Sequence, residues 1–287
     1  MFQSARTMRS VALVCLLPAL GLLDSPVKAQ EPPFNVVFIL ADDVGFECFG
    51  AYGSREYATP RLDALAAGGI RFENCHSTPL CTPSRVNLMT GKSNVFNYVD
   101  FGVFPEGEAT FAHYFKAAGY VTAVVGKWQL MTENGGVTPT DAGFDTYCLK
   151  STAQTELGDY WSPSMEADGK LLDLPKGTYG PDVEMRFLLD FIAENKDRPF
   201  FLYYAMPLVH SPFFPTPDSA DRDETDPKKN FVDMVAYMDK CVGQIADALE
   251  THGLRDRTLV VFTGDNGTHF EIVSELGGVQ IQGGKGY

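Results

Sequence analysis

The sequence predicts an α/β fold in which a mostly parallel β-sheet carries helices on both faces. Short apolar runs rich in β-branched residues alternate along the chain with stretches in which apolar residues recur at helical spacing. Polar clusters follow these runs, as expected where the carboxyl ends of parallel strands form a ligand site. Of the 287 residues, 45% are hydrophobic and 21% are charged, so the chain can bury a core and does not have a disordered composition.

The first predicted strand covers residues 35–40 and delivers Asp42 and Asp43 into a loop. Pro60 in the first turn and Gly68 past the end then delimit a helix over residues 61–67. The other expected elements, in chain order, are a helix at 110–118, a strand at 120–125, a helix at 182–194, a strand at 199–206, a surface loop with four prolines at 211–230, a helix at 231–251 and a strand at 258–263.

The charge balance bears on the class of partner. The formal net charge of -14 disfavours a sequence-independent hold on nucleic acid, because phosphate neutralisation needs clustered Lys and Arg and no run of this chain is basic. The acid-rich segment 218–226 is expected to be a solvated loop. We therefore expect no nucleic-acid partner.

The first 29 residues have the pattern of a secretory signal peptide. Arg6 and Arg9 precede an apolar run at 11–23, and a small-residue cleavage pattern ends at Ala29. The apolar run is too short for a comfortable membrane span and contains Pro18, so an uncleaved anchor is the weaker interpretation. We therefore expect an exported protein, periplasmic or secreted, without a stable membrane span.

Export would permit disulfides among the cysteines that follow the leader, but their odd number leaves at least one thiol unpaired. If Cys81 is set aside, the other four allow three pairings, among which the sequence does not choose. Free buried cysteines are an equally good interpretation. The cysteines after the leader are Cys48, Cys75, Cys81, Cys148 and Cys241.

Two pairs of oxygen-bearing side chains each follow a predicted strand: Asp42 with Asp43, and Asp265 with Asn266. Carboxylate and amide oxygens at one edge of a sheet suit Ca²⁺ or Mg²⁺ and not zinc, which prefers imidazole or thiolate. An Asp after a strand also commonly caps a helix or forms a turn, and for one pair alone that would be the better interpretation. The presence of both pairs favours a metal site.

Residues 79–91 form a loop that enters a helix, with Pro83 in its first turn and Gly91 past its end. Cys81 therefore lies near a helix amino end, where free N–H groups favour an anion, and Arg85 adds a fork that matches sulfate or phosphate oxygens. The alternative for a lone cysteine is a buried structural role.

This segment resembles a known family. The Cys-x-Pro-x-Arg core at Cys81, with its Leu-Met-Thr-Gly tail, resembles the defining signature of the type I sulfatases, a branch of the alkaline phosphatase superfamily. The resemblance runs from about Phe34 to the last residue. It implies an alkaline phosphatase-like sheet, a catalytic domain over residues 34–287 that is incomplete at its C-terminus, and the absence of the family's C-terminal subdomain.

Further segments carry the same resemblance. Residues 35–43 resemble the family's opening strand and metal pair, and residues 59–63 its next helix, where Arg61 replaces a more usual Asn. Residues 119–130 resemble the second signature, with Gln129 at the usual histidine position. Two further matches are the active-site histidine loop, at His210-Ser211-Pro212, and the late catalytic lysine, at Lys285.

The resemblance implies a set of cofactors and ligands. A separate formylglycine-generating enzyme would convert Cys81 to formylglycine, whose hydrated aldehyde is the family's nucleophile. A divalent cation, Ca²⁺ in preference to Mg²⁺, would contact modified Cys81 and the substrate sulfate. The other metal ligands implied are Asp42, Asp43, Asp265 and Asn266.

The resemblance also implies roles in the reaction. Asp265 would take the hydroxyl proton, and attack at sulfur would give a covalent enzyme sulfate that the second hydroxyl then expels. Arg85 would orient the modified residue, and Lys127 and Lys285 would spread the charge of the sulfate oxygens. His210, with Lys285, would protonate the leaving alcohol. Gln129 can hydrogen-bond to the diol but cannot act as a base near neutral pH.

Three functions follow from these observations. The first is a sulfatase that cleaves the sulfate ester of a carbohydrate or another small molecule. The second is a phosphodiester or phosphonate monoester hydrolase that uses the same nucleophile and metal. The third is a non-catalytic, sulfatase-like protein that binds sulfated ligands, a hypothesis motivated by Gln129.

Overall fold

The computed structural model describes residues 33–132, 135–150 and 160–287. The predicted leader, residues 1–29, lies outside the described residues. Within the described part, no helix is both long and apolar enough to cross a membrane.

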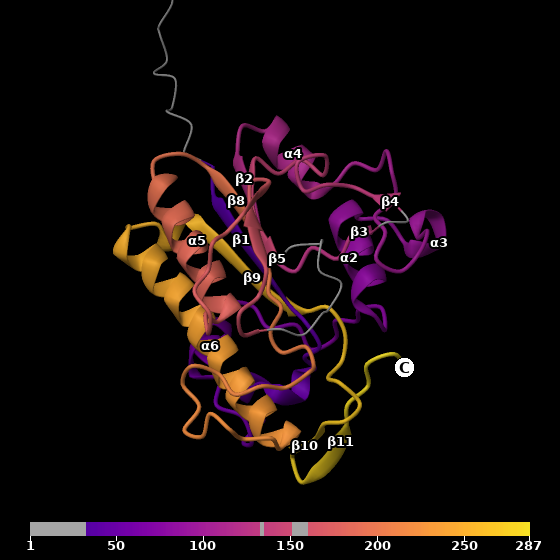
Figure 1. The fold of residues 1–287 in the computed structure, drawn as a ribbon, viewed down its shortest axis with the longest axis vertical. Helices are drawn as coiled ribbons and strands as arrows, with labels where there is room; N and C mark the ends of the chain where they lie inside the picture. Colours follow the sequence, from indigo (N-terminus) through magenta and orange to yellow (C-terminus); the bar gives the residue numbers. More distant parts are fainter. Residues whose placement is uncertain (1–32, 133–134, 151–159) are drawn as a thin grey trace, which may run out of the picture. The chain divides into compact units, whose positions relative to one another are not determined.

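A seven-stranded sheet forms the centre of the fold, in the order β7-β6-β5-β2-β8-β1-β9 (Figure 1). Five of its strands are parallel: β1 (Asn35–Ala41), β2 (Val121–Gly126), β5 (Thr146–Lys150), β8 (Phe200–Ala205) and β9 (Thr258–Gly264). The strands β6 (Met165–Ala167) and β7 (Lys170–Leu171) extend one edge in antiparallel pairing. Two short antiparallel pairs stand apart from this sheet: β3 (Met131–Thr132) with β4 (Gly135–Gly136), and β10 (Val273–Leu276) with β11 (Val279–Gln282).

The predicted α/β class and the parallel sheet are confirmed. The strands expected at 35–40, 120–125, 199–206 and 258–263 correspond to β1, β2, β8 and β9, each within one residue at either end. The sequence pattern missed β5, the antiparallel edge and both short hairpins. Strands of two to five residues have too few apolar positions to show a period. Pairing with neighbouring strands therefore determines their conformation more than their own sequence does.

Six helices accompany the described strands: α1 (Pro60–Ala67), α2 (Cys81–Thr90), α3 (Asn94–Asn97), α4 (Phe111–Ala117), α5 (Gly180–Glu194) and α6 (Pro227–Thr251). Short 3₁₀ turns lie at η1 (Phe46–Cys48), η2 (Gly50–Tyr52) and η3 (Arg255–Arg257). The amino end of α4 is a capping box. In α4, the Thr110 hydroxyl accepts from the N–H of Ala112 at 3.1 Å, and the His113 ring accepts from the N–H of Thr110 at 3.1 Å.

The predicted surface loop at 211–230 is wrong in two respects. Its last four residues are the first turn of α6, because the Asp226 carboxylate caps the helix by accepting from the N–H of Lys228 at 2.9 Å and Pro227 fits the first turn. The loop is also partly buried, since Phe213 packs edge-on against Phe231 with 5.4 Å between ring centroids.

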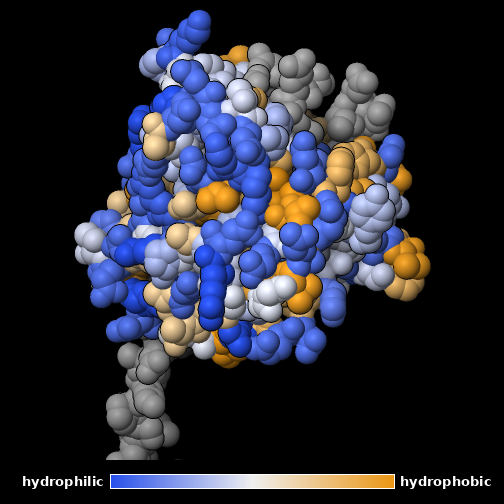
Figure 2. Space-filling view, turned by 90° about the horizontal axis from the view of Figure 1, so that it is seen from below, coloured by the Kyte–Doolittle hydropathy of each residue, from blue (hydrophilic) through white to orange (hydrophobic). Residues whose placement is uncertain are grey.

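Helices cover both faces of the sheet, as predicted (Figure 1). On β8, Phe200, Leu202 and Tyr204 belong to the core cluster that α5 and α6 complete. Phe201 and Tyr203 alternate with them and belong to the second cluster, which α2 and α4 complete. Because these strands are buried on both faces, polar side chains can gather at their carboxyl ends. On the face shown in Figure 2, hydrophobic side chains form small groups among hydrophilic ones.

Candidate functional site

The register of β1 and β9 brings the two acidic pairs together. Ala41 lies opposite Gly264, so the residues that follow each strand are neighbours. The N–H of Asp43 donates to Asp265 Oδ1 at 3.2 Å, and Asn266 Nδ2 donates to Asp43 Oδ1 at 2.7 Å. The three carboxylates and the amide are therefore within one buried cluster at the end of the sheet.

Two buried cations lie against these acids. Lys127, which follows β2, donates from Nζ to Asp42 Oδ2 at 2.5 Å. Arg85, on α2 and 1% exposed, donates from Nη2 to Asp265 Oδ2 at 3.0 Å and from Nη1 to the backbone carbonyl of Lys127 at 3.2 Å. The terminal nitrogens of Arg85 thus hold two strand-end loops together.

A third cation and a histidine complete the other side of the cluster. Lys285 Nζ donates to Asp43 Oδ2 at 2.6 Å and lies 3.0 Å from His210 Nε2. His210 Nε2 is in turn 3.6 Å from Asp43 Oδ2. Both side chains are partly exposed, unlike the buried Arg85 and Lys127.

Cys81 is the first residue of α2 and is 2% exposed. Its thiol donates to Gln129 Oε1 at 3.0 Å. Burial raises the pKa of this thiol, and the charges of Lys127 and Asp42 act on it in opposite directions. The unmodified thiol therefore stays protonated at neutral pH and is a poor nucleophile.

The pKa values of the other titratable groups in the cluster respond to burial and to neighbouring charges in different ways. Burial opposes ionisation of Asp42, but the charges of Lys127 and His210 outweigh it and hold its pKa well below the ordinary value. Burial and the neighbouring Asp42 charge raise the pKa of Asp265 to about 7. Burial lowers the pKa of His210, although Asp42 partly offsets this effect.

The cluster fits a hard cation. Within the described residues, the buried atoms Asp42 Oδ1 and Asn266 Oδ1 have no hydrogen-bond partner. An unpaired buried oxygen is costly unless another ligand satisfies it, and both atoms belong to side chains that are predicted to bind metal. Carboxylate and amide oxygens are the donor set that Ca²⁺ and Mg²⁺ take.

Comparison with known proteins gives the family. The sulfatase family model matches residues 34–287. The chain belongs to the sulfatase family. Among curated sulfatases it is 34% identical over 278 residues to arylsulfatase A of Homo sapiens, covering 85% of this chain and 54% of that protein. It is 30% identical over 282 residues to N-acetylgalactosamine-6-sulfatase of Homo sapiens, covering 87% and 53%.

Solved structures confirm the alkaline phosphatase-like sulfatase fold. The crystal structure of Ps i-CgsB in complex with k-i-k-neocarrahexaose aligns with a TM-score of 0.73 at 25% identity, covering 84% of this chain and 60% of that chain. The chain spans about half the length of the curated sulfatases that it matches.

Two residues of this sulfatase cluster have left-handed backbone conformations. The φ angles of Asp43 and Gln129 are 58° and 48°. Non-glycine residues adopt this conformation rarely and only where the surrounding structure imposes it, often at functional sites. Both side chains are thus directed by backbone geometry that the sequence signature does not reveal.

Sequence reasoning missed Thr268, a fully buried residue beside the acidic pair. Its hydroxyl accepts from the N–H of Gly45 at 2.9 Å and donates to Glu47 Oε1 at 2.5 Å. Its carbonyl accepts from the N–H of Lys285 at 3.0 Å. Thr268 therefore joins the loops after β1 and β9 to the segment that carries Lys285, and no motif signals this tertiary role.

The structure describes five of the cysteines, and all five are free. Cys75 is exposed and the other four are buried. Of the interpretations that the sequence left open, the structure thus shows free thiols and none of the three pairings.

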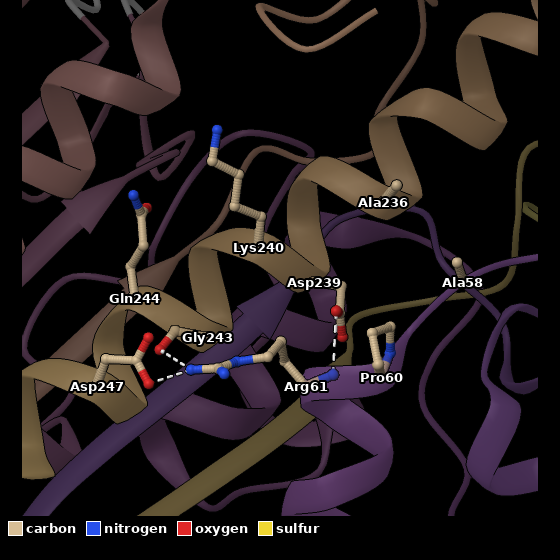
Figure 3. A pocket seen from close by; sticks show the side chains of 9 residues that line it. All are labelled: Ala58, Pro60, Arg61, Ala236, Asp239, Lys240, Gly243, Gln244 and Asp247. Atoms are coloured by element: carbon tan, nitrogen blue, oxygen red, sulfur yellow. Dashed lines mark hydrogen bonds and ion pairs between the residues drawn. The ribbon is translucent and has the colours of Figure 1, made fainter.

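Arg61, the departure from the family's usual Asn, lies outside the cluster in a groove between α1 and α6 (Figure 3). Its guanidinium donates to the carbonyl of Gly243 at 3.0 Å and pairs with Asp247. Asp239 accepts from the N–H groups of Arg61 and Leu62 at 3.1 and 2.8 Å and so caps α1. Arg61 therefore fastens α1 to α6.

Proposed function

We propose that residues 34–287 form the catalytic region of a sulfatase that hydrolyses the sulfate ester of a carbohydrate or another small molecule. The reaction joins water to the ester and yields an alcohol and inorganic sulfate. The nucleophile is a formylglycine that a maturation enzyme makes from Cys81. The observation that carries the proposal is the position of Cys81 beside Gln129, with the charges of Lys127, Asp42, Arg85 and Asp265 all acting on its side chain.

Sulfate is favoured over phosphate as the substrate group. The curated relatives are named arylsulfatase A and N-acetylgalactosamine-6-sulfatase, and they match most of this chain. A carbohydrate substrate is supported by the structural neighbour Ps i-CgsB, which was solved in complex with k-i-k-neocarrahexaose.

Different residues of the cluster have different roles in this proposal. Asp42, Asp43, Asp265 and Asn266 would hold Ca²⁺, which when bound offsets the negative charge of the carboxylates and of the substrate sulfate. The aldehyde made from Cys81 supplies, as its hydrate, a hydroxyl nucleophile.

The basic residues of the cluster keep this arrangement in place and assist the reaction. Arg85 fixes the Asp265 carboxylate and the carbonyl of Lys127, so it holds the base and the lysine at set positions. Lys127 and Lys285 stabilise negative charge on the sulfate oxygens. His210 and Lys285, 3.0 Å apart, supply the proton that the leaving alcohol oxygen takes.

Export belongs to the same proposal. We infer that residues 1–29 direct the chain out of the cytoplasm and are removed after Ala29. Mass spectrometry of the exported protein should give a mature chain that begins at Gln30. A chain retained in the cytoplasm with its leader intact would contradict the inference.

The deciding experiment is a sulfate-release assay on the full chain, co-produced with a formylglycine-generating enzyme and supplied with Ca²⁺. We expect release from nitrocatechol sulfate and a loss of about a thousandfold or more in Cys81→Ala. Cys148→Ala is the matched control, because Cys148 is also a buried free thiol but lies on β5, outside the cluster.

The same assay separates the alternatives. Faster cleavage of bis-nitrophenyl phosphate than of the sulfate ester would favour the phosphodiesterase. Binding of the sulfated compound without turnover, in protein whose Cys81 is fully converted, would favour the non-catalytic protein.

A further inference from the structure

Tyr160 lies beside the loop that carries His210. Its hydroxyl donates to the backbone carbonyls of Pro207 and His210, at 2.7 and 2.9 Å. A phenol has a single proton to donate, so the two carbonyls share it. We propose that Tyr160 is a positioning residue that sets the His210 ring against Lys285, an inference that rests on the proposed function.

The backbone of Asp42 also holds this loop. The N–H of Asp42 donates to the carbonyl of Leu208 at 2.9 Å, and the N–H of Val209 donates to the carbonyl of Asp42 at 2.7 Å. Tyr160 and the backbone of Asp42 therefore both hold residues 207–210. Losing the Tyr160 contact would leave the loop fixed at Asp42 and free to shift at His210.

Tyr160 is itself firmly anchored. The residue is 6% exposed, and its backbone carbonyl accepts from the N–H of Gly180 at the start of α5, at 2.7 Å. Its ring packs against that of Tyr179 with 5.9 Å between centroids and an interplanar angle of 25°. A buried ring with a fixed backbone can hold the loop in one place.

The His210 ring depends on the backbone that Tyr160 fixes. His210 Nδ1 contacts the carbonyl of Ser211, which can only accept, so Nδ1 carries the proton. His210 Nε2 is then the atom that faces Lys285 Nζ at 3.0 Å. Displacement of the His210 carbonyl would move both contacts together.

In the proposed reaction, the position of the His210 ring matters when the leaving group departs. When the sulfur–oxygen bond breaks, its electron pair goes to the leaving oxygen, which takes a proton from the pair formed by His210 and Lys285. A sugar or alkyl alcohol leaves poorly unless it receives that proton, whereas a nitrophenol leaves as a stable anion. A misplaced His210 should therefore slow alkyl esters selectively.

The test is Tyr160→Phe in the full, Cys81-converted chain, assayed with an alkyl sulfate ester and with nitrocatechol sulfate. We expect kcat/KM for the alkyl ester to fall about tenfold and kcat/KM for the aryl ester to change less than about twofold, because kcat/KM includes only the steps up to departure of the alcohol. The ratio of the two rates does not depend on how much of the preparation is folded. Loss of stability alone would lower both rates equally.

Tyr179→Phe is the matched control. It removes the same hydroxyl from the ring packed against Tyr160, and in the described part of the chain that hydroxyl has no hydrogen-bond partner. It should leave the ratio unchanged. An unchanged ratio in Tyr160→Phe, with an active parent, would overturn the inference alone. A parent that releases sulfate from neither ester would overturn the proposed function and this inference with it.

Discussion

Asp42 at the strand ends and Glu184 on α5 are both buried carboxylates, 0% and 3% exposed, yet they differ in charge. Burial raises the pKa of each. At Asp42, Lys127 and the neighbouring cations reverse that effect. At Glu184, a hydrogen bond from the Tyr204 hydroxyl at 3.0 Å and the charge of Lys150 do not, and the pKa rises to about 8. Burial therefore does not decide whether a carboxylate is charged, and its neighbours do.

The strand-end cluster and the surroundings of Glu184 should therefore have different roles. The strand-end cluster concentrates opposite charges, which is expensive for stability and useful for holding a metal and an anionic ester. Glu184 sits in the core between α5 and β8 as a neutral acid at moderate pH. It affects stability, and its effect depends on pH.

Arg85→Met should have the largest effect on stability. It removes a cation from the strand-end cluster, whose carboxylates would then lack sufficient compensating charge, as Glu184 does. Removing a buried guanidinium leaves Asp265 and Asp42 short of a cation, and we expect the free energy of unfolding to fall by about 3–5 kcal/mol. Urea unfolding at neutral pH measures the change. Arg61→Met is the control: its exposed pair with Asp247 should be worth about 1 kcal/mol or less. Equal losses in the two variants would contradict the account.

Glu184→Gln should have the next largest effect, visible in the pH dependence of stability. The folded pKa of about 8 lies above the ordinary value of 4.5, so the folded state binds more protons between these values and the parent loses stability as pH rises. Relative to Glu184→Gln, the parent should lose on the order of 3 kcal/mol between about pH 5 and pH 8. Urea unfolding across this range measures the difference. Parallel curves would show that Glu184 is ionised in the folded protein.

Gln129→His tests whether a base at this position of the strand-end cluster speeds the reaction. Gln129 contacts the Cys81 thiol but cannot carry a proton between groups. A histidine tolerates the left-handed conformation at this position and could act as a base. We expect kcat for sulfate release to rise about tenfold. Gln129→Asn is the control, since asparagine also suits this conformation and has no basic nitrogen. An equal change in both variants would mean that the effect comes from the backbone.

Tyr204→Phe should have the smallest effect, because the neutral Glu184 loses one hydrogen bond and no charge. The expected loss in the free energy of unfolding is about 1 kcal/mol at about pH 5, where the acid is protonated. Tyr179→Phe removes a hydroxyl that, within the described residues, lacks a partner, and should cost less. A loss several times larger in Tyr204→Phe would mean that Glu184 is charged there and needs the hydroxyl.

The sequence predicted the strands and helices that have enough length to show a period, and it predicted the polar ends of the strands. The alternation of strands and helices along the chain implies a parallel sheet. Only the structure shows that β1 and β9 are neighbours, which brings Asp42 and Asp265 together. The signature around Cys81 placed this residue at a helix amino end.

Other features depend on contacts between distant segments, and no local pattern could indicate them. Tyr160 carries no motif and acquires its role from two carbonyls about fifty residues away. The local sequence of Arg85 indicates no acidic partner, and only the fold shows that its terminal nitrogens contact Asp265 and the backbone carbonyl of Lys127. Thr268 is another case, because its partners come from two distant segments, the loop after β1 and the segment that carries Lys285.

The central claim is that the residue made from Cys81 hydrolyses a sulfate ester. The most direct test is to measure the initial rate of sulfate release in preparations of the full chain that differ in the fraction of Cys81 converted, with that fraction determined by mass spectrometry of the same samples. We expect a rate that is proportional to the converted fraction and negligible at zero conversion. No release at full conversion with Ca²⁺ present, or equal release from unconverted protein, would contradict it.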